Sequence, residues 1–468
     1  MRSLLVGLLL STSIPLCHAG MEGRIDRFVQ SEMERQHIPG VALGVVKDGD
    51  VLVAKGYGLA DVEQRVAITP DTVFLAASIT KQFTAAAVML LVQDGKLALD
   101  ASITKYLPRA PAAWKPITVR HLLTHTSGIA DYDEDDSMVD WTRHPTEDQI
   151  VRLLYSMPLQ FPPGARWNYS NTGYALLGVI IHSVTGKPWW DVLGERVFTP
   201  LDMKTAGKFT DQDIVPNRAE GYHLTEAGLR NDEWIAPEWF VTADGGLSVS
   251  LLDLIKWTRA PGDGQVLDPK GWAQVFEPVR LRSGRPYPYG FGWFVDTVAG
   301  KPVRRHCGDW RGYRDCLAIF PENGLTVIVL TNLGEAYPSI ILKGVAAIVD
   351  PRLAPPEPVP IADAEPAVTD RLRRLLVAAP PPHGPSRDLP ATLWPLFPSD
   401  MKGYKESLSM LHEMGPLDRL DLVSRREIGD DVGYLYLARY PARTLEVAFG
   451  LGPGGKVSHF SLRPSDTR

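Results

Sequence analysis

Cysteine is scarce in this sequence, which has three cysteines in 468 residues: Cys17, Cys307 and Cys316. Because Cys17 falls in an expected leader segment, the mature chain can form at most one internal disulfide. Cys307 and Cys316 are spaced to face each other on two adjacent antiparallel strands, and an exported protein meets oxidising conditions. Sequence alone does not provide the Cβ geometry that a bridge needs, so a disulfide and two buried free thiols both remain open.

An excess of positive charge and long apolar runs are also missing. The formal net charge is −6, which leaves no basic footprint for nucleic acid. At the N-terminus, Arg2 precedes an apolar core at residues 4–10 and a possible cleavage after Ala19. This pattern predicts an export signal, and no later segment is long enough to span a bilayer. We therefore expect a soluble periplasmic or secreted protein without a transmembrane segment.

The remaining composition is that of a globular protein, with 44% hydrophobic and 22% charged residues. The chain is too long for one ordinary domain, and no internal repeat is visible. Five prolines between Pro351 and Pro360 indicate a stiff extended linker, beyond which the composition changes. We expect four segments: a signal peptide at residues 1–19, a main domain at 20–350, a Pro-rich linker at 351–366 and a small domain at 367–468.

Strand patterns lie at the two ends of the main domain. Two alternating runs flank Lys47-Asp48-Gly49-Asp50, which is a hairpin signal, and the segment between the two ends is mostly helical. This predicts an α+β fold in which helices flank an antiparallel sheet built from both ends of the sequence, with an inserted helical region. Strands are expected at residues 41–46, 51–57, 291–295, 303–307, 316–320 and 325–330, and helices at 22–36, 119–123, 146–156, 174–184, 251–258 and 338–349.

The segment beyond the linker predicts a small α+β domain. Its helical stretches are at residues 369–377 and 401–411. Four alternating runs follow, which indicate a meander. No catalytic cluster is present in it, so a packing or partner-binding module is the better interpretation.

Ser78-Ile79-Thr80-Lys81 opens a long apolar run that continues to Asp94. The run is rich in helix formers and is closed by Gly95, which predicts a buried helix. Ser78 would then have backbone N–H groups and positive dipole charge beside it, and Lys81 would follow one turn later on the same face. An isolated S-x-x-K occurs by chance in about one chain of this size, so an N-cap serine with a solvated lysine is the starting alternative.

Three further stretches raise the serine above chance: Tyr169-Ser170-Asn171, His306-Cys307-Gly308 at the end of an expected strand, and the Gly-aromatic strand start Tyr289-Gly290-Phe291-Gly292-Trp293. The order of S-x-x-K, Y-x-N and a strand motif ending in Gly resembles the penicillin-recognising serine enzymes, especially class C β-lactamases, D-aminopeptidases and family VIII carboxylesterases. The stretches at residues 121–129, 243–247 and 309–332 look family-like too, and the resemblance covers roughly residues 25–350. It implies a β-lactamase/transpeptidase-like fold and an acyl-enzyme mechanism without metal or other cofactor.

Ser78, Lys81 and Tyr169 are the expected catalytic residues. Ser78 attacks a carbonyl, and Lys81 can accept its proton if burial and the helix dipole keep the amine neutral. Tyr169, if close to both, would be partly ionised whenever the amine is protonated, and could pass the proton to the leaving group.

Asn171, His306, Gly308 and Asp309 are the expected substrate-binding residues. The Asn171 amide can orient both Lys81 and a substrate amide. Gly308 would let a substrate backbone lie against the edge strand. The resemblance implies that the N–H groups of Asp309 and Ser78 form the oxyanion hole.

His306 stands where penicillin-hydrolysing relatives usually carry the lysine of Lys-Thr-Gly. Because histidine is largely neutral near pH 7, efficient β-lactam hydrolysis is in doubt, and the motif looks like the His-x-Gly of D-aminopeptidase-like members. Four arginines near the motif could restore carboxylate binding or could be ordinary solvated charges: Arg304, Arg305, Arg311 and Arg314.

Two other clusters have structural alternatives. His121 and His125 have a helical spacing that could suggest a metal, but no third ligand is evident and a hydrogen-bonding role is favoured. The acidic residues at 131 and 133–136 could attract a free amino group, although a solvated loop is the simpler interpretation.

We therefore expect an exported serine hydrolase that acts on a small molecule, peptide or ester, with amides of D-amino acids favoured. The alternatives are a carboxylesterase, a weak β-lactamase or a penicillin-binding sensor. A partner-binding module remains a further class. Oligomeric state and the role of the C-terminal domain stay open.

Overall fold

The computed structural model describes residues 14–133, 139–208, 213–225, 227–232, 239, 242–377, 411 and 414–465. Within these residues, the main sheet has seven strands in the order β3-β2-β1-β12-β11-β10-β9. The first and last parts of the main domain meet where β1 pairs antiparallel with β12, with Val41 opposite Thr331. This confirms a sheet built from both ends of the sequence. The strands are β1 (Gly40–Lys47), β2 (Asp50–Asp61), β3 (Val66–Ala67), β9 (Phe294–Val298), β10 (Lys301–Trp310), β11 (Tyr313–Phe320) and β12 (Leu325–Thr331).

The predicted hairpin forms between β1 and β2. Asp48 and Gly49 both adopt positive φ, 52° and 92°, which is the conformation that a tight hairpin turn requires. The strand expected at residues 291–295 instead begins at Phe294. Gly292 has a φ of 77°, and a Cβ there would lie 2.6 Å from the carbonyl oxygen of Lys81. The chain is therefore pressed against the Lys81 backbone before it enters the sheet.

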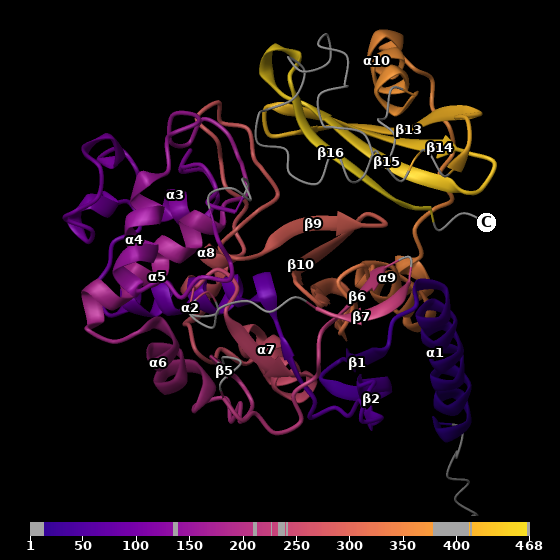
Figure 1. Cartoon of the computed structure of the whole chain (residues 1–468), viewed down its shortest axis with the longest axis horizontal. Coiled ribbons are helices and arrows are strands. Elements are labelled where there is room, and N and C mark those ends of the chain that lie inside the picture. The colour runs from indigo at the N-terminus through magenta and orange to yellow at the C-terminus, as the bar shows by residue number, and fades with distance from the viewer. Residues whose placement is uncertain are drawn as a thin grey trace, which may run out of the picture.

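Alternate side chains of β1 enter two different cores, as the two-residue period of a strand requires. Val41, Leu43 and Val45 pack with α1 and α9, whereas Ala42 and Val46 join the core of the helical region. Figure 1 shows α1 (Ile14–Gln36) and α9 (Pro338–Val349) on one side of the sheet and the helical region on the other. The central sheet is thus covered on both faces.

The inserted region is mostly helical, as expected, and several of its helices begin at a side-chain cap. Thr118 and Thr146 each form a capping box with the residue three positions on. Its helices are α2 (Thr80–Gln93), α3 (Val119–Leu123), α4 (Glu147–Ser156), α5 (Asn171–Thr185), α6 (Trp189–Leu193), α7 (Leu251–Asp263) and α8 (Pro269–Val275). Short strands accompany them: β4 (Val73–Leu75), β5 (Gly207–Lys208), β6 (Tyr222–Thr225), β7 (Gly228–Asn231) and β8 (Leu247–Ser250).

The C-terminal part forms a separate sheet domain, which confirms the predicted α+β unit. Its four strands run in sequence order, and helix α10 (Pro366–Val377) buries Leu372, Leu375 and Leu376 against them. The expected helix at residues 401–411 lies outside the described residues except for Leu411. The strands are β13 (Arg419–Ile428), β14 (Asp431–Arg439), β15 (Thr444–Leu451) and β16 (Val457–Pro464).

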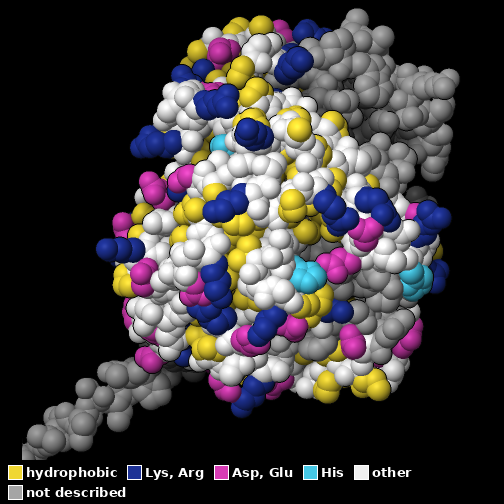
Figure 2. Space-filling view, turned by 90° about the vertical axis from the view of Figure 1, so that its left-hand side faces the viewer, with side chains coloured by type: hydrophobic (Ala, Val, Ile, Leu, Met, Phe, Trp, Pro, Cys, Tyr) yellow, Lys and Arg dark blue, Asp and Glu magenta, His cyan; other side chains and the backbone are white. Residues whose placement is uncertain are grey.

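Helix α1 begins at Ile14 and continues through Ala19, across the expected cleavage site, while residues 1–13 lie outside the described part. None of the described helices combines the length and the apolar character needed to cross a membrane. Figure 2 shows that Lys and Arg side chains are interspersed with Asp and Glu over the face formed by the helical region.

Candidate active site

Ser78 lies at a sharp bend immediately before the helix that carries Lys81. The sequence predicted Ser78 as the start of this helix, but the α-helix begins at Thr80, and Ser78 sits in a 3₁₀ turn, η1 (Ala77–Ile79). Ala77 has a φ of 45°, an uncommon conformation for a residue with a Cβ. Backbone hydrogen bonding of Ala76 N–H to Leu247 O at 2.8 Å holds the bend against β8. The bend leaves Ser78 partly exposed between two buried neighbours.

Lys81 is fully buried, and its Nζ contacts three oxygen atoms. The distances are 3.0 Å to Ser78 Oγ, 2.7 Å to Asn171 Oδ1 and 2.8 Å to Asp244 O. The amide and carbonyl oxygens can only accept hydrogen bonds, whereas the serine hydroxyl can also donate. Nζ is placed as donor to all three oxygens, and a neutral amine would keep the two bonds to the pure acceptors and could take the Ser78 proton on its lone pair.

Burial lowers the pKa of Lys81 to about 8, although three nearby carboxylates, Asp244, Asp131 and Asp133, oppose the shift. A substantial fraction of the amine is therefore neutral at mildly alkaline pH. The geometry and the burial of Lys81 both suit a proton acceptor for Ser78.

We expect the rate of Ser78 acylation to rise about tenfold per pH unit up to about pH 8 and then to level off, because only the neutral amine accepts a proton. The pKa values of His125 and His306 are lowered and that of Tyr169 is raised, so these groups do not titrate in this window, whereas Asp131, with a pKa raised to about 7, adds a smaller bend near pH 7. The second-order rate of labelling by a fluorophosphonate between pH 6 and pH 10 measures this profile. A rate independent of pH below 8 would contradict it.

Tyr169 also lies against Ser78. Its hydroxyl is hydrogen-bonded to Ser78, and the Lys81 Nζ is 4.8 Å from the centre of its ring. Burial nevertheless raises the pKa of Tyr169 well above its ordinary value, despite the lowering effect of the Ser78 hydrogen bond. The phenol is therefore protonated, which differs from the expectation of a partly ionised tyrosine. The expectation neglected how strongly the surrounding rings remove this side chain from water.

Asn171 is held in place by a buried carboxylate that the sequence placed in a solvated loop. Asp131 is 6% exposed and accepts hydrogen bonds from the N–H groups of Asn171, at 2.7 Å, and Thr172, at 3.0 Å. It thus caps the first turn of α5 together with Ser170. Burial raises the pKa of Asp131 to about 7. The solvated interpretation was wrong for Asp131, and residues 134–136 of this loop lie outside the described residues.

A chain of hydrogen bonds joins Ser170 of the Tyr169-Ser170-Asn171 motif to Cys307 of the His306-Cys307-Gly308 motif. Ser170 N–H donates to His125 Nδ1 at 3.0 Å, so the neutral His125 ring carries its proton on Nε2. His125 Nε2 lies 3.0 Å from Tyr289 Oη, which lies 3.2 Å from His306 Nε2. His306 Nδ1 in turn lies 2.7 Å from Cys307 O, which can only accept. One proton arrangement satisfies every contact, with both histidines neutral. His125 Nε2–H donates to Tyr289 Oη, the Tyr289 hydroxyl donates to His306 Nε2, and His306 Nδ1–H donates to Cys307 O.

His306 is consequently not a free cation facing the site. It is 2% exposed, both of its ring nitrogens have partners within the protein, and burial lowers its pKa to about 3. A direct polar contact with a substrate would have to displace Tyr289 or the Cys307 carbonyl. His125 has the structural role that the sequence favoured, and His121 Nδ1 accepts a hydrogen bond from the Thr118 N–H. No cluster of three metal-ligating side chains occurs in the described ranges.

Gly308 allows β10 to approach the turn that carries the nucleophile. A Cβ at this position would lie 2.4 Å from Ala76 O and 3.1 Å from Ala77 Cβ. Its close neighbour is therefore the Ser78 segment, a contact that the sequence did not predict, and the expected approach of a substrate backbone stays a prediction. The required glycine was identified, but its partner is far away in sequence and had no local signal.

The backbone of Asp309 lies on the free edge of β10. Pairing with β9 ends at Arg305, and the short Cα–Cα distance of 4.0 Å between Cys307 and Cys316 is that of a non-hydrogen-bonded pair, so the Cys307 backbone groups face away from β11 toward this edge. In an antiparallel pair the outward-facing residues alternate, so the N–H of Asp309 points to the same edge. The Asp309 side chain forms an ion pair with Arg314 at 3.1 Å.

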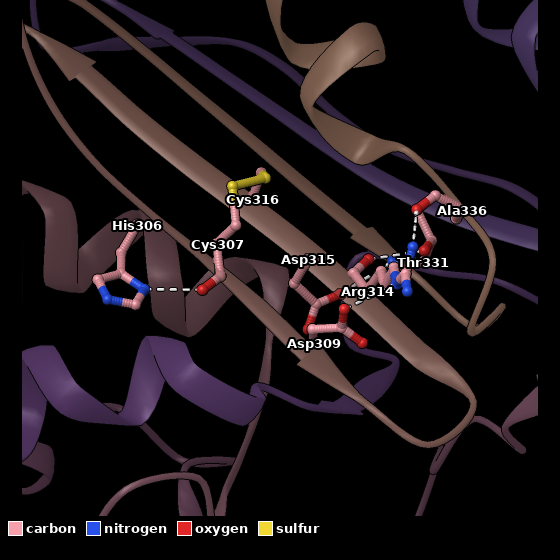
Figure 3. Close-up of a disulfide and its surroundings, with 8 residues drawn as sticks. All are labelled: His306, Cys307, Asp309, Arg314, Asp315, Cys316, Thr331 and Ala336. Atoms are coloured by element: carbon pink, nitrogen blue, oxygen red, sulfur yellow. Dashed lines mark hydrogen bonds and ion pairs between the residues drawn. A yellow bond between two sulfur atoms is a disulfide. The ribbon is translucent and has the colours of Figure 1, made fainter. Parts of the chain in front are cut away.

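Cys307 and Cys316 form a disulfide between facing positions of β10 and β11. Figure 3 shows this bridge beside His306, with the ion pair of Asp309 and Arg314 near the turn that joins the two strands. Of the two states that the sequence left open, the structure therefore has the bridged one. The bridge links the strand of the His306 motif to the interior of the sheet.

The arginines near the motif have contacts within the protein. Arg304 lies 3.9 Å from the centre of the Phe276 ring, and Arg305 lies 5.0 Å from that of Phe294 and pairs with Asp296 at 3.8 Å. Such contacts satisfy guanidinium groups without a substrate carboxylate. The structure provides no support for the carboxylate-binding alternative at Arg304 or Arg305.

Comparison with known proteins agrees with this arrangement. A family model described as Beta-lactamase matches residues 25–341. A D-aminopeptidase of Gluconobacter oxydans (strain 621H) is 32% identical over 319 residues, which are 66% of this chain and 58% of the relative. The chain thus spans less than two thirds of that relative's length.

Two solved structures share the fold. The D-amino acid amidase from Ochrobactrum anthropi SV3, complexed with D-phenylalanine, is 29% identical with a TM-score of 0.60, and the match covers 71% of this chain and 98% of that one. The octameric penicillin-binding protein homologue from Pyrococcus abyssi is 24% identical with a TM-score of 0.63 and covers 94% and 99%. From the extent of the family match, the chain belongs to the Beta-lactamase family, within the serine β-lactamase/transpeptidase superfamily, and is a serine hydrolase.

Proposed function

We propose that the protein hydrolyses amides of D-amino acids through an acyl-enzyme on Ser78. The observation that carries this proposal is the set of contacts made by Lys81. Its Nζ lies 3.0 Å from Ser78 Oγ, and its other two partners are oxygens that can only accept hydrogen bonds. Ser78 Oγ attacks the carbonyl carbon as its proton passes to Lys81. Burial lowers the lysine pKa to about 8 against the opposing effect of the nearby carboxylates, which makes this transfer possible near neutral pH.

The oxyanion of the tetrahedral intermediate is assigned to two backbone N–H groups. Ser78 contributes one from η1, and Asp309 contributes the other from the free edge of β10. The packing of Gly308 on Ala76 sets the separation of these two segments. Backbone donors held in this way need no reorganisation when charge develops on the oxygen.

Tyr169 is the assigned route to the leaving group. Its neutral hydroxyl is hydrogen-bonded to Ser78, so it can give its proton to the departing amine and recover one from Lys81. Water then attacks the acyl-enzyme, and the same groups return the proton to Ser78 Oγ. The overall reaction consumes one water molecule and releases an amine and an acid.

The substrate preference is proposed from the groups around Asn171. Asp133 accepts a hydrogen bond from Asn171 Nδ2 at 3.4 Å, and it gives this side of the site a carboxylate suited to a free α-ammonium. His306 supplies no positive charge for a substrate carboxylate. Aromatic rings adjoin the same region and suit an apolar side chain: Tyr132, Trp141, Trp239 and Trp310. The preference for D-stereochemistry rests on the named relatives.

We expect D-phenylalaninamide to be hydrolysed at least about tenfold faster than its L-enantiomer or its N-acetyl derivative. Asp133→Asn should raise the KM for D-phenylalaninamide about tenfold and leave the N-acetyl derivative unaffected, because only the free amine loses an ion pair. Asp140→Asn, an exposed residue near the same loop, is the matched control. Release of ammonia measures each rate.

Parallel assays with an ester and with a penicillin separate the alternatives. Turnover of p-nitrophenyl esters without any turnover of D-amides would favour a carboxylesterase. A stable adduct with a penicillin, without turnover, would favour a sensor. Either result would overturn the assignment of a D-amidase.

We also propose that the protein is exported to the periplasm or secreted, with residues 1–19 as the signal and residues 20–350 as the hydrolase domain. The proposal for export rests on Arg2, the apolar core at residues 4–10 and the small residue Ala19. Mass spectrometry of the mature N-terminus tests it: an N-terminus at residue 20 is expected, and an intact Met1 would contradict cleavage.

A further inference from the structure

The C-terminal domain touches the main domain beside the candidate active site. The contact is made by the turn between β13 and β14, whose Gly429 has a φ of 61°. A Cβ at Gly429 would lie 2.9 Å from Leu281 Cδ1 and 3.1 Å from Tyr287 Cδ2. The turn therefore rests directly on these two side chains, and Figure 1 shows the C-terminal sheet above β9 on this side of the molecule.

Charged side chains surround this contact. Arg285 lies 3.7 Å from Glu427 and 3.9 Å from Asp430, and Arg426 reaches back to Asp296 of β9 at 3.8 Å. These ion pairs are long and partly exposed, so each contributes little to the stability of the contact between the domains. Their main effect is on the orientation of the turn. The close contact at Gly429 determines how near the two domains can come.

Leu281 and Tyr287 belong to a backbone hairpin that leads into the site. This segment, residues 279–289, is called the site hairpin. It is closed by hydrogen bonds from Val279 N–H to Tyr289 O, at 2.9 Å, and from Tyr287 N–H to Val279 O, at 2.8 Å. Arg282 N–H donates to Gly164 O at 2.8 Å, which attaches the hairpin to the loop before Tyr169.

The site hairpin presents two tyrosines to the catalytic groups. Tyr289 links His125 to His306. Tyr287 stacks face to face on Trp167, with ring centres 4.2 Å apart and an angle of 12°. Trp167 in turn lies 6.3 Å from the Tyr169 ring and 5.8 Å from the His125 ring. A continuous series of contacts thus runs from Gly429 through Tyr287 and Trp167 to Tyr169.

We propose that the β13–β14 turn of the C-terminal domain is a positioning element for the active site: by packing on the site hairpin it holds Tyr287 against Trp167 and thereby fixes Tyr169 beside Ser78. This inference rests on the proposed function of Ser78 and Tyr169. It assigns to the C-terminal domain a role in the reaction although no residue of that domain touches the reacting atoms.

The test uses full-length variants at two glycines of the C-terminal domain. Gly429→Leu should lower kcat for the best amide about 10- to 100-fold with little change in KM, because displacement of Tyr169 affects proton transfer more than binding. Gly454→Leu is the matched control: Gly454 also has a positive φ, 76°, but a Cβ there meets nothing within 4 Å. The control should keep the wild-type kcat, although it carries the same backbone strain.

A double-mutant cycle with Tyr287→Ala makes the test independent of folding defects in the glycine variant. Tyr287→Ala alone should lower kcat at least about tenfold, and adding Gly429→Leu to it should have little further effect, since the stack that transmits the displacement is already gone. Independent, multiplicative effects would overturn the proposal, as would an unchanged kcat in folded Tyr287→Ala. Equal losses for Gly429→Leu and Gly454→Leu would overturn it too.

The outcomes also separate this inference from the proposed function. If wild-type protein shows no acylation of Ser78 and no turnover, the proposed function fails. If wild-type protein is active and the Gly429 and Tyr287 variants match it, only the positioning role of the C-terminal turn fails.

Discussion

Lys81→Ala is expected to lower the rate of Ser78 acylation by about 1,000-fold or more, because the only base within 3.0 Å of Ser78 Oγ in the described hydrogen-bond network is removed. Asn171 Oδ1 and Asp244 O lose their donor in the same step, which costs about 1–3 kcal/mol each if water does not replace it. We therefore expect a less stable but folded protein. Intact-mass labelling with a fluorophosphonate measures the rate, and a thermal melt measures the stability.

Two companion variants separate loss of the base from loss of packing. Lys81→Met keeps an unbranched side chain of similar length and should be as inactive as Lys81→Ala while filling more of the space. Lys55→Ala, which breaks a surface pair with Asp26 at 2.7 Å, should label at the wild-type rate. Undiminished labelling of either Lys81 variant would show that another group accepts the serine proton.

Gly308→Ala should also reduce acylation strongly, by about 100-fold, although it adds only one methyl group. The new Cβ would lie 2.4 Å from Ala76 O, so β10 must move away from the turn that carries Ser78. The two backbone N–H groups assigned to the oxyanion hole lie on these two segments, and a displacement of about 1 Å costs about this factor. Overpacking should destabilise the fold by about 1–3 kcal/mol.

The matched control for this variant is Gly262→Ala. Gly262 also lacks a positive φ, and a Cβ there meets no atom within 4 Å, so its labelling rate should be unchanged. A folded Gly308→Ala protein that labels as fast as wild type would show that β10 does not set the geometry around Ser78.

The main features of the fold could be predicted because they depend on local patterns. The alternation around Asp48 and Gly49 predicted the β1–β2 hairpin, and a similar pattern near residue 320 predicted strands that join the same sheet. The bend at Ser78 could not be predicted, since Ala77 carries no signal for a φ of 45°. It is imposed by β8 and β10, which are distant in sequence.

The candidate site was predicted as a set of motifs, and the structure brings Ser78, Lys81, Tyr169 and Asn171 together. Their roles in a reaction stay predictions. The contacts between motifs were beyond sequence reasoning, because Tyr289 and His125 are 164 positions apart and neither has a local pattern that shows a shared hydrogen bond. The same holds for Asp131, whose position in an acidic run suggested solvent although its carboxylate caps α5.

His306 is the residue for which the sequence and the structure explain the same property in the most different ways. Its replacement of a lysine was visible in the sequence, and the absence of a fixed cation was inferred from that. The reason for the neutrality is structural, since Tyr289 and the Cys307 carbonyl occupy both ring nitrogens. The disulfide of Cys307 with Cys316 was likewise only one of two open states.

The central claim is that Ser78 is the nucleophile, and the most direct test is to trap the acyl-enzyme. Wild-type protein is incubated with a fluorophosphonate or an activated D-phenylalanine ester, quenched in acid, digested and mapped by mass spectrometry. One adduct per chain, on Ser78, at a rate that rises with pH up to about 8, is the predicted result. An adduct on another residue, or no adduct with any acylating probe, would contradict the account.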